Sequence, residues 1–379
     1  MRPLEGIRVI DFSTLLPGPL ATLLLAEAGA EVIKIERPGD GDEMRRHGPT
    51  LGADGVNFAL LNRGKRSIAI DLKAPDALAR LRPLIERADI LVEQFRPGVM
   101  DRLGLGPAAL AALNPRLIYC AITGYGQAGP KAGVAGHDLN YCADSGLLSL
   151  AAGSDGAPVV PAALVADIAG RAYPAVINIL LALQQRAATG KGCRLDVSMT
   201  DSLATFLFWA MGAGLAVGRW PKPGGELLSG GSPRYRLYRT ADDRFVATAA
   251  LEDRFWANFC EAIGLPDGLR DDRVDVGATT AAVADLIRAR TAAEWTQRFA
   301  GNDACCCVVA TVAEALADPH FRARGLFDHR VQGGGAGIAA LPVPIDAIFR
   351  NAAGSVSYPA LGEANGLLSA DPATPAPSR

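Results

Sequence analysis

Residues 7–36 read IRVIDFSTLLPGPLATLLLAEAGAEVIKIE, and this stretch decides the fold class. It opens with Ile7–Phe12, whose β-branched and aromatic residues are typical of a strand. A break at Pro17–Pro19 follows, and Leu20–Glu27 predicts a helix with a proline near its first turn. A second strand is expected at Glu31–Glu36. A strand, a helix and a strand in this order predict a βαβ unit of a parallel sheet.

The same alternation continues along the chain. Further strands are expected at Ser67–Leu72, Ile90–Phe95, Leu117–Thr123 and Arg194–Met199, with helices at Pro75–Ala88, Pro107–Leu113 and from Asp167 to about Arg186. Asp167 would cap the last helix through its carboxylate. This helix should stop before the loop Thr189–Gly192. The succession predicts an α/β fold with a Rossmann-like, mainly parallel sheet.

A chain of 379 residues is long enough for two domains. A segment rich in Gly, Pro and Ser at Pro221–Pro233 indicates a linker or mobile loop. After it, strands at Tyr235–Tyr238 and Phe245–Ala250 and three helical patterns predict a smaller α+β domain. The predicted division is a large domain at 1–220, a small domain with linkers at 221–325, a return to the large domain at 326–369 and a disordered tail at 370–379.

Composition narrows the classes of function. The net charge is −2, so no overall positive field indicates nucleic acid as a partner. We find no secretory signal and no run of about 18 uninterrupted apolar residues, and we therefore expect a cytoplasmic protein without a membrane span. The seven cysteines lack a CxxC spacing. Cys305–Val309 is expected to be a buried strand rather than a metal site.

Gly124–Gly129 fits the pattern GxGxxG, but the residues after it do not open a convincing helix. The dinucleotide fingerprint requires that helix, so we expect a glycine turn that lets the backbone approach a ligand. Arg37 and Arg96 each follow a predicted strand. They could meet phosphates at the carboxyl edge of the sheet, or they could be ordinary solvated charges. His137 lies in an irregular polar loop, where sites often occur.

Together these segments resemble the class III CoA-transferase family (CaiB/BaiF type), and they lie closest to its racemase branch. The match extends from Leu4 to about Arg350. Its motifs are Leu4–Asp11, Pro17–Pro19, Gly29–Gly39, Asn62–Ser67, Arg96–Gly98, Arg102–Gly104, Thr123–Gly126 and Thr189–Gly192. The resemblance implies an interlocked homodimer that acts on an acyl-CoA thioester, with coenzyme A as part of the substrate and neither a metal nor a separate cofactor.

The resemblance also implies the site residues. Coenzyme A would contact Arg37, the strand end from Ile70 to Lys73, Arg96, Arg102, Gly136 and Tyr141. The motif from Gly136 to Tyr141 is similar to that of the racemase branch, which pairs its histidine with an aspartate thirty residues later. These two residues are His137 and Asp167 here, and a third, Glu252, would hydrogen-bond the histidine.

The implied reaction is the removal of the proton α to a thioester and its return on the other face. Backbone N–H groups at the start of the Asp167 helix would stabilise the enolate oxygen. In the alternative, Asp167 attacks the thioester and CoA passes to a second carboxylic acid. A third possibility is an acyl-CoA-binding protein without catalysis. Arg171 departs from the glycines usual at this point and could line the acyl pocket.

Overall fold

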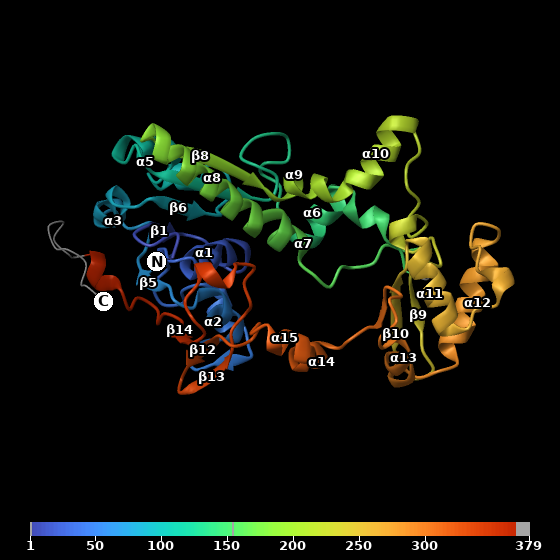
Figure 1. Ribbon diagram of the computed structural model, residues 1–379. Helices are drawn as coiled ribbons and strands as arrows, with labels where there is room; N and C mark the ends of the chain where they lie inside the picture. Colours follow the sequence, from blue (N-terminus) through green and yellow to red (C-terminus); the bar gives the residue numbers. More distant parts are fainter. Residues whose placement is uncertain (1, 154, 369–379) are drawn as a thin grey trace. The chain divides into compact units, whose positions relative to one another are not determined.

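The computed structural model describes residues 2–153 and 155–368, which form two compact units (Figure 1). The large unit contains residues 2–145 and 161–205 and the chain from Pro319 on, and the small unit contains Gly146–Val160 and Phe206–Asp318. The predicted domain ranges stay a prediction. The observed units differ from them, since 146–160 and 206–220 group with the small unit. The predicted tail at 370–379 lies outside the described residues.

Six parallel strands form the sheet of the large unit, in the order β5-β2-β1-β6-β7-β8. The strands are β1 Arg8–Asp11, β2 Glu31–Glu36, β5 Arg66–Ala69, β6 Ile90–Glu93, β7 Ile118–Thr123 and β8 Cys193–Ser198. The register places Arg8 opposite Glu31 and Ile118 opposite Cys193. The predicted parallel α/β sheet is confirmed.

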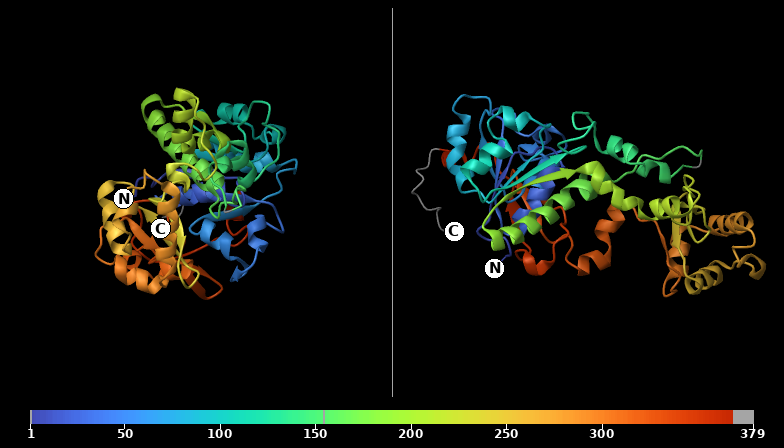
Figure 2. Two further views of the ribbon diagram at one scale, coloured as in Figure 1. Left: turned by 90° about the vertical axis from the view of Figure 1, so that its right-hand side faces the viewer. Right: turned by 90° about the horizontal axis from the view of Figure 1, so that it is seen from above.

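Helices cover both faces of this sheet (Figures 1 and 2). Their bounds are α1 Pro17–Glu27, α3 Ala77–Glu86, α5 Pro107–Leu113 and α8 Tyr173–Thr189. Successive strand residues point to opposite faces. Val9 accordingly packs with α1 and α8, whereas Ile10 packs with α3 and α5. Both faces are buried, which explains why the strands read as continuous apolar runs.

The strand order reverses between β1 and β6, which are neighbours in the sheet but not in the sequence. Gln94, just after β6, spans this point: its Nε2 donates to the Thr14 carbonyl at 2.6 Å, and its Oε1 accepts the Gly18 N–H at 3.3 Å. Open α/β sheets bind their ligands beside such a reversal, at the carboxyl ends of the strands. The topology therefore marks this edge as the place to search for a site.

The last part of the chain completes the large unit. It contains a small sheet of β12 Arg330–Gly333, β13 Ala336–Ala339 and β14 Ser355–Ser357, which packs near α2 Val56–Asn62. Two contacts tie it to the N-terminal half: Arg63 Nη2 donates to the Leu341 carbonyl, and the Asn365 side chain accepts the Ala69 N–H, both at 2.8 Å.

The small unit is built on a three-stranded antiparallel sheet in the order β11-β10-β9. Its elements are β9 Tyr235–Arg239, β10 Phe245–Ala249 and β11 Cys306–Val308, with helices α11 Asp253–Ile263, α12 Val276–Arg288 and α13 Ala292–Phe299. The predicted strands and helices are present. The expectation of a fully buried cysteine strand is wrong, because Cys306 faces the core whereas Cys305 and Cys307 are exposed.

Two helical segments are long and apolar enough, by length and mean hydropathy, to cross a bilayer: Val165–Thr189 and Met199–Val217. The criterion of uninterrupted apolar residues did not find them. The first segment carries the buried side chains of Ala175 and Ile179, which pack in the core on one face of the sheet. A core helix passes the same test, so these two segments are weak evidence for a membrane protein, and the expected absence of a membrane partner stays a prediction.

Candidate active site

Basic side chains follow three of the strands, β5, β2 and β6, at the carboxyl ends of the large sheet's strands. Arg37 comes directly after β2, Lys73 follows β5, and Arg96 and Arg102 follow β6. All four side chains are exposed. Because the strands are parallel, their carboxyl ends meet at one edge, and these cations can neutralise phosphates there. Ile70 differs, since its side chain is buried in the core and only its backbone is left for a ligand.

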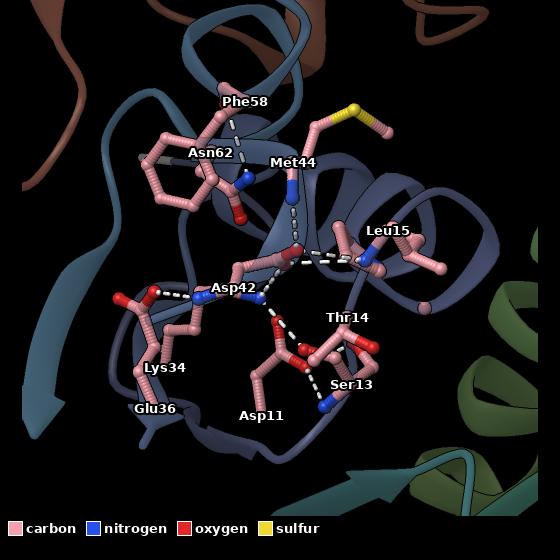
Figure 3. Close-up of polar contacts among 12 residues, drawn as sticks. Asp11, Ser13, Thr14, Leu15, Lys34, Glu36, Asp42, Met44, Phe58 and Asn62 are labelled. Atoms are coloured by element: carbon pink, nitrogen blue, oxygen red, sulfur yellow. Dashed lines mark hydrogen bonds and ion pairs between the residues drawn. The ribbon is translucent and has the colours of Figure 1, made fainter. Parts of the chain in front are cut away.

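A buried polar network orders the loops beside this edge (Figure 3). Lys34, from β2, is 2.9 Å from Asp42 Oδ2 and donates to the Ser13 carbonyl at 2.7 Å. Asp42 in turn accepts the N–H groups of Leu15 and Met44 at 3.1 and 3.0 Å. The network joins the loop after β1 to the loop after β2, so it fixes the segment that carries Arg37.

A second part of this network surrounds Asp11, at the end of β1. Its Oδ2 accepts the Thr22 hydroxyl at 2.6 Å and Lys65 Nζ at 3.2 Å. Burial alone would raise the pKa of Asp11, but Lys65 and Lys34 hold that pKa below its usual range. Every one of these charges is paired or hydrogen-bonded, which is the condition for burying charge without a large penalty.

His137 lies immediately before helix α6, Asp138–Asp144, in a loop that depends on close packing around Tyr141. The Tyr141 hydroxyl donates to the Gly136 carbonyl, and its ring is buried. A Cβ atom on Gly124 or Gly136 would lie only 2.5 or 2.8 Å from that ring. The glycines thus make room for Tyr141 rather than for a ligand. The His137 side chain is exposed, and Asn140 Oδ1 accepts its backbone N–H at 3.0 Å.

Asp167 ends a short helix, α7 Val165–Asp167, and continues into the π-helical segment Ile168–Ala172 and then α8. The expectation that Asp167 caps the helix is therefore wrong: the helical segment begins two residues earlier, and no capping bond from its side chain forms. The N–H groups of Val165, Asp167 and Ile168 already donate to Ala163, Asp138 and Leu164. These three expected donors for an enolate oxygen are engaged.

Asp138 ties the two candidate catalytic residues together. It follows His137 in the chain, and its Oδ1 accepts the Asp167 N–H at 2.9 Å. Its other oxygen accepts the Cys142 thiol, whose pKa is raised to about 11, first by burial. The sequence analysis did not single out Asp138; its position next to the histidine was the one available signal, and its burial is visible only in the structure.

The electrostatic environment of Asp167 is mixed. Burial raises the pKa of its carboxyl, Arg171 opposes that increase, Asp138 adds to it and His137 opposes it, and the pKa ends above the usual range. The charge of His137 therefore influences the pKa of Asp167. No hydrogen bond or ion pair joins the two side chains in the described part of the chain. An acid–base pair needs room for the reacting carbon between its members, so a direct bond between the two side chains is not required.

Arg171 lies near Asp167, and Glu93 in turn interacts electrostatically with Arg171. Arg171 is buried, and its Nη1 is 3.9 Å from Asp167 Oδ1. Glu93, at the end of β6, accepts the Phe95 N–H at 2.8 Å, and burial raises its pKa to about 7. A carboxyl that titrates near neutrality at this edge is a candidate functional group that the sequence did not indicate, because strand position alone does not reveal burial.

Glu252 immediately precedes α11 in the small unit, where its side chain is exposed. His137 and Asp167 belong to the large unit, so the predicted hydrogen bond between Glu252 and His137 stays a prediction. Among residues 2–153 and 155–368, no group of three or more His, Cys, Asp and Glu side chains could hold a metal ion.

Two sizeable cavities are lined by neither His137 nor Asp167. One of about 780 Å³ lies at the amino end of β2 and β5, lined by Arg2, Arg63 and Arg66 among others. Another of about 920 Å³ lies on the open face of the small sheet, beside Cys305 and Cys307. The arginines of the first cavity are each paired with a glutamate. The lining of both cavities contains none of the predicted site residues.

The fold and the site define an α/β protein with an imidazole and a carboxylate beside the carboxyl ends of the strands of a parallel sheet. Residues 4–365 match CoA-transferase family III. The chain is 39% identical over 333 residues to human alpha-methylacyl-CoA racemase, covering 86% of this chain and 82% of the relative. It is 35% identical over 352 residues to the acetyl-CoA:oxalate CoA-transferase of Acetobacter aceti, covering 90% and 89%.

A solved structure supports the same assignment. The crystal structure of a CaiB/BaiF family protein from Brucella suis matches with a TM-score of 0.82 and 30% sequence identity, covering 97% of this chain and 98% of that chain. The chain belongs to CoA-transferase family III. Racemases and CoA-transferases are both among its relatives, so family membership alone does not decide between the two reactions.

Proposed function

We propose that this protein is an acyl-CoA racemase or epimerase that interconverts the two forms of a 2-methylacyl-CoA. The observation that carries the proposal is the presentation of His137 and Asp167 from two helical segments that Asp138 joins through the Asp167 N–H. An imidazole and a carboxylate are the two groups that a two-base exchange of an α-proton needs. The 39% identity to a racemase adds support.

In this mechanism one group removes the α-proton from one face of the thioester and the other returns a proton to the opposite face. The C–H electron pair moves into an enolate, whose oxygen carries the negative charge until reprotonation. Asp167 acts as a base only when ionised, and His137 only when neutral. In the direction in which Asp167 is the base, its carboxyl must have lost its proton, and its raised pKa moves that requirement to higher pH, whereas in the reverse direction Asp167 supplies the proton.

Coenzyme A would bind along the carboxyl edge of the large sheet. Arg37, Lys73, Arg96 and Arg102 supply positive charge there, and the network of Lys34 and Asp42 holds the loop of Arg37 in place. The exposed guanidinium of Arg37 is paired with Asp40 only at 3.7 Å, so a phosphate can replace that contact at little cost.

A CoA-transferase is the second candidate. It uses Asp167 as a nucleophile: the carboxylate attacks the thioester, CoA leaves as a thiolate, and a mixed anhydride remains for reaction with a second acid. The neighbouring Arg171 guanidinium, which opposes the rise in the pKa of Asp167, favours the ionised carboxylate that this route needs. In this route His137 has no essential part.

The deciding experiment is ¹H NMR in D₂O with a 2-methylacyl-CoA and no added acid. A racemase exchanges the α-proton for deuterium, and His137→Ala should abolish that exchange. If the wild type shows no exchange but transfers CoA to an added carboxylic acid, the racemase proposal is wrong and the transferase is right. Binding of the acyl-CoA with neither reaction would indicate a non-catalytic binding protein.

We also propose a homodimer of interlocked chains in the cytoplasm. Its support is a set of large apolar side chains that stand exposed in the small unit of the isolated chain, at 61 to 74% for Phe208, Leu215, Val217 and Trp220. Apolar side chains this exposed commonly mark an interface. Light scattering after size-exclusion chromatography should give twice the 39.5 kDa mass of one chain, and a monomer would contradict the proposal.

A further inference from the structure

Arg171 is a buried arginine with too few partners. Its Nη2 donates to the Ile122 carbonyl at 2.9 Å, while Nη1 reaches only the Met199 thioether at 3.5 Å. Nε is buried and has no hydrogen-bond partner. A guanidinium carries five N–H donors, and leaving several of them unpaired in the interior costs free energy. Such an exception calls for an explanation in function.

A second arginine of the same helical run shows the ordinary arrangement. Arg186, in α8, is as buried as Arg171. Its Nη2 lies 2.9 Å from Asp89 Oδ1, and its Nη1 donates to the carbonyls of Asp89 and Arg116 at 3.3 and 3.2 Å. Arg186 therefore has the partners that a structural role requires, and Arg171 does not.

The local backbone places Arg171 one helical turn beyond Asp167. The π-helical segment Ile168–Ala172 interrupts the regular helix at this point, and such segments occur often at functional sites. Nη1 of Arg171 is 3.9 Å from Asp167 Oδ1, longer than a hydrogen bond. Catalytic contacts are often this long without substrate and become shorter when the site fills.

The charges around the pair favour such a contact. Asp138, which accepts the Asp167 N–H, adds a second carboxylate beside it. Tyr141 and Cys142 face Asp167 from α6, and His137 does so from the residue before that helix. Glu93 and Cys120 also interact electrostatically with Arg171, and α9 Met199–Leu203 contributes the Met199 thioether. Arg171 is the buried cation that offsets this negative charge.

We propose that Arg171 is a positioning residue for Asp167, which holds the carboxylate ionised and oriented by closing the 3.9 Å gap into a charge-assisted hydrogen bond. The inference rests on the proposed role of Asp167 as the reacting carboxylate. It explains why a charged side chain occupies a position in this buried turn. The closed contact uses the second N–H of Nη1, the nitrogen that otherwise donates to the Met199 thioether.

The test is a titration of Asp167 by ¹³C NMR in protein labelled at the aspartate side-chain carboxyl carbon, with Asp167→Asn to assign the signal. An opposite charge at this range lowers a carboxyl pKa by about one to three pH units. Arg171→Met should raise the pKa of Asp167 by that amount, and Arg171→Lys, which keeps the charge, should restore most of it. An unchanged pKa in Arg171→Met would overturn the proposal.

Arg186→Met is the matched control, because it removes a buried arginine from the same helical run. It should lower stability and leave the titration of Asp167 unchanged; an equal rise in the pKa would mean that the effect is a general loss of structure, and would overturn the proposal. If Arg171→Met does not fold, Arg171→Gln is the second uncharged variant, with the same expected rise.

Activity gives an independent check. Arg171→Met should lower kcat/KM about tenfold to a hundredfold at neutral pH, mainly through kcat, and should move the acid limb of the pH profile upward. In Arg171→Lys the acid limb of the pH profile should return toward its wild-type position. An acid limb that does not shift in Arg171→Met would count against the proposal. A wild type inactive in both assays would refute the proposed function, whereas the NMR titration would still decide the role of Arg171.

Discussion

Two buried charged regions of the large unit differ in how completely they are paired. Around Asp11, Lys34 and Asp42, each charge meets an opposite charge or a hydrogen-bonding group at 2.6 to 3.2 Å. Around Asp167 and Arg171, the ion pair is 3.9 Å long and a guanidinium nitrogen has no partner. A fully paired cluster rigidifies the fold, whereas an incompletely paired one retains hydrogen-bonding groups that can interact with a substrate.

The largest expected effect falls on catalysis. Asp167→Asn removes the reacting carboxylate under both proposed reactions, so kcat/KM should fall about a hundredfold to ten-thousandfold. The folding transition measured by calorimetry should stay close to that of the wild type, since no hydrogen bond shorter than 3.5 Å to the Asp167 side chain is found in the described chain. Asp144→Asn, an exposed position in the same region, serves as the control and should keep its activity.

The next effect concerns stability. Lys34→Met leaves Asp42 and Asp11 buried with less positive charge, and breaking a buried pair in this way costs about 3–5 kcal/mol of unfolding free energy. Urea denaturation would measure it. Arg82→Ala, which removes an exposed pair with Glu86, should cost about 0–1 kcal/mol. Equal losses of unfolding free energy in the two variants would mean that the buried network contributes no more to stability than an exposed surface ion pair.

A smaller effect is expected at the glycine that supports His137. Gly136→Ala places a Cβ atom 2.8 Å from the Tyr141 ring, and such overpacking costs about 1–3 kcal/mol. Gly133→Ala, where nothing lies within 4 Å, should change stability by less than about 0.5 kcal/mol. Thermal unfolding of both variants checks the prediction, and a neutral Gly136→Ala would show that Tyr141 can move freely.

The smallest effect belongs to Asp167, whose contribution to the unfolding free energy should change with pH in the opposite sense to that of Asp42. The pKa of Asp42 is held down by Lys34 against the opposing effect of burial, so Asp42 stabilises the fold above its unfolded pKa and that contribution is lost as pH falls. The pKa of Asp167 is raised, first by burial, so its ionisation destabilises the fold as pH rises above about 3.9.

The two asparagine variants should therefore diverge at neutral pH. Asp42→Asn should be less stable than the wild type and Asp167→Asn slightly more stable, and both differences should shrink toward pH 3. Unfolding free energies measured from pH 3 to 7 test this. A loss of stability at neutral pH in Asp167→Asn would mean that this carboxylate is structural, like Asp42.

Much of the architecture followed from the sequence alone. The strand at Glu31–Glu36 and the helix at Pro107–Leu113 lie at the predicted residues, because apolar pattern and helix-breaking residues act locally. The family motifs likewise pointed to His137 and Asp167. Strand positions, helix positions and short motifs depend on residues within a few positions of one another in the chain, so they can be predicted directly from the sequence.

The tertiary structure decided the rest. It placed Asp167 inside a helical run rather than at its cap, engaged three N–H groups expected to hold an enolate, and buried Arg171 with spare donors. It also moved Cys305 and Cys307 to the surface and raised the pKa of Glu93 to about 7 through burial. Burial and hydrogen-bond partners are set by segments distant in the chain, so spacing along the sequence cannot reveal them.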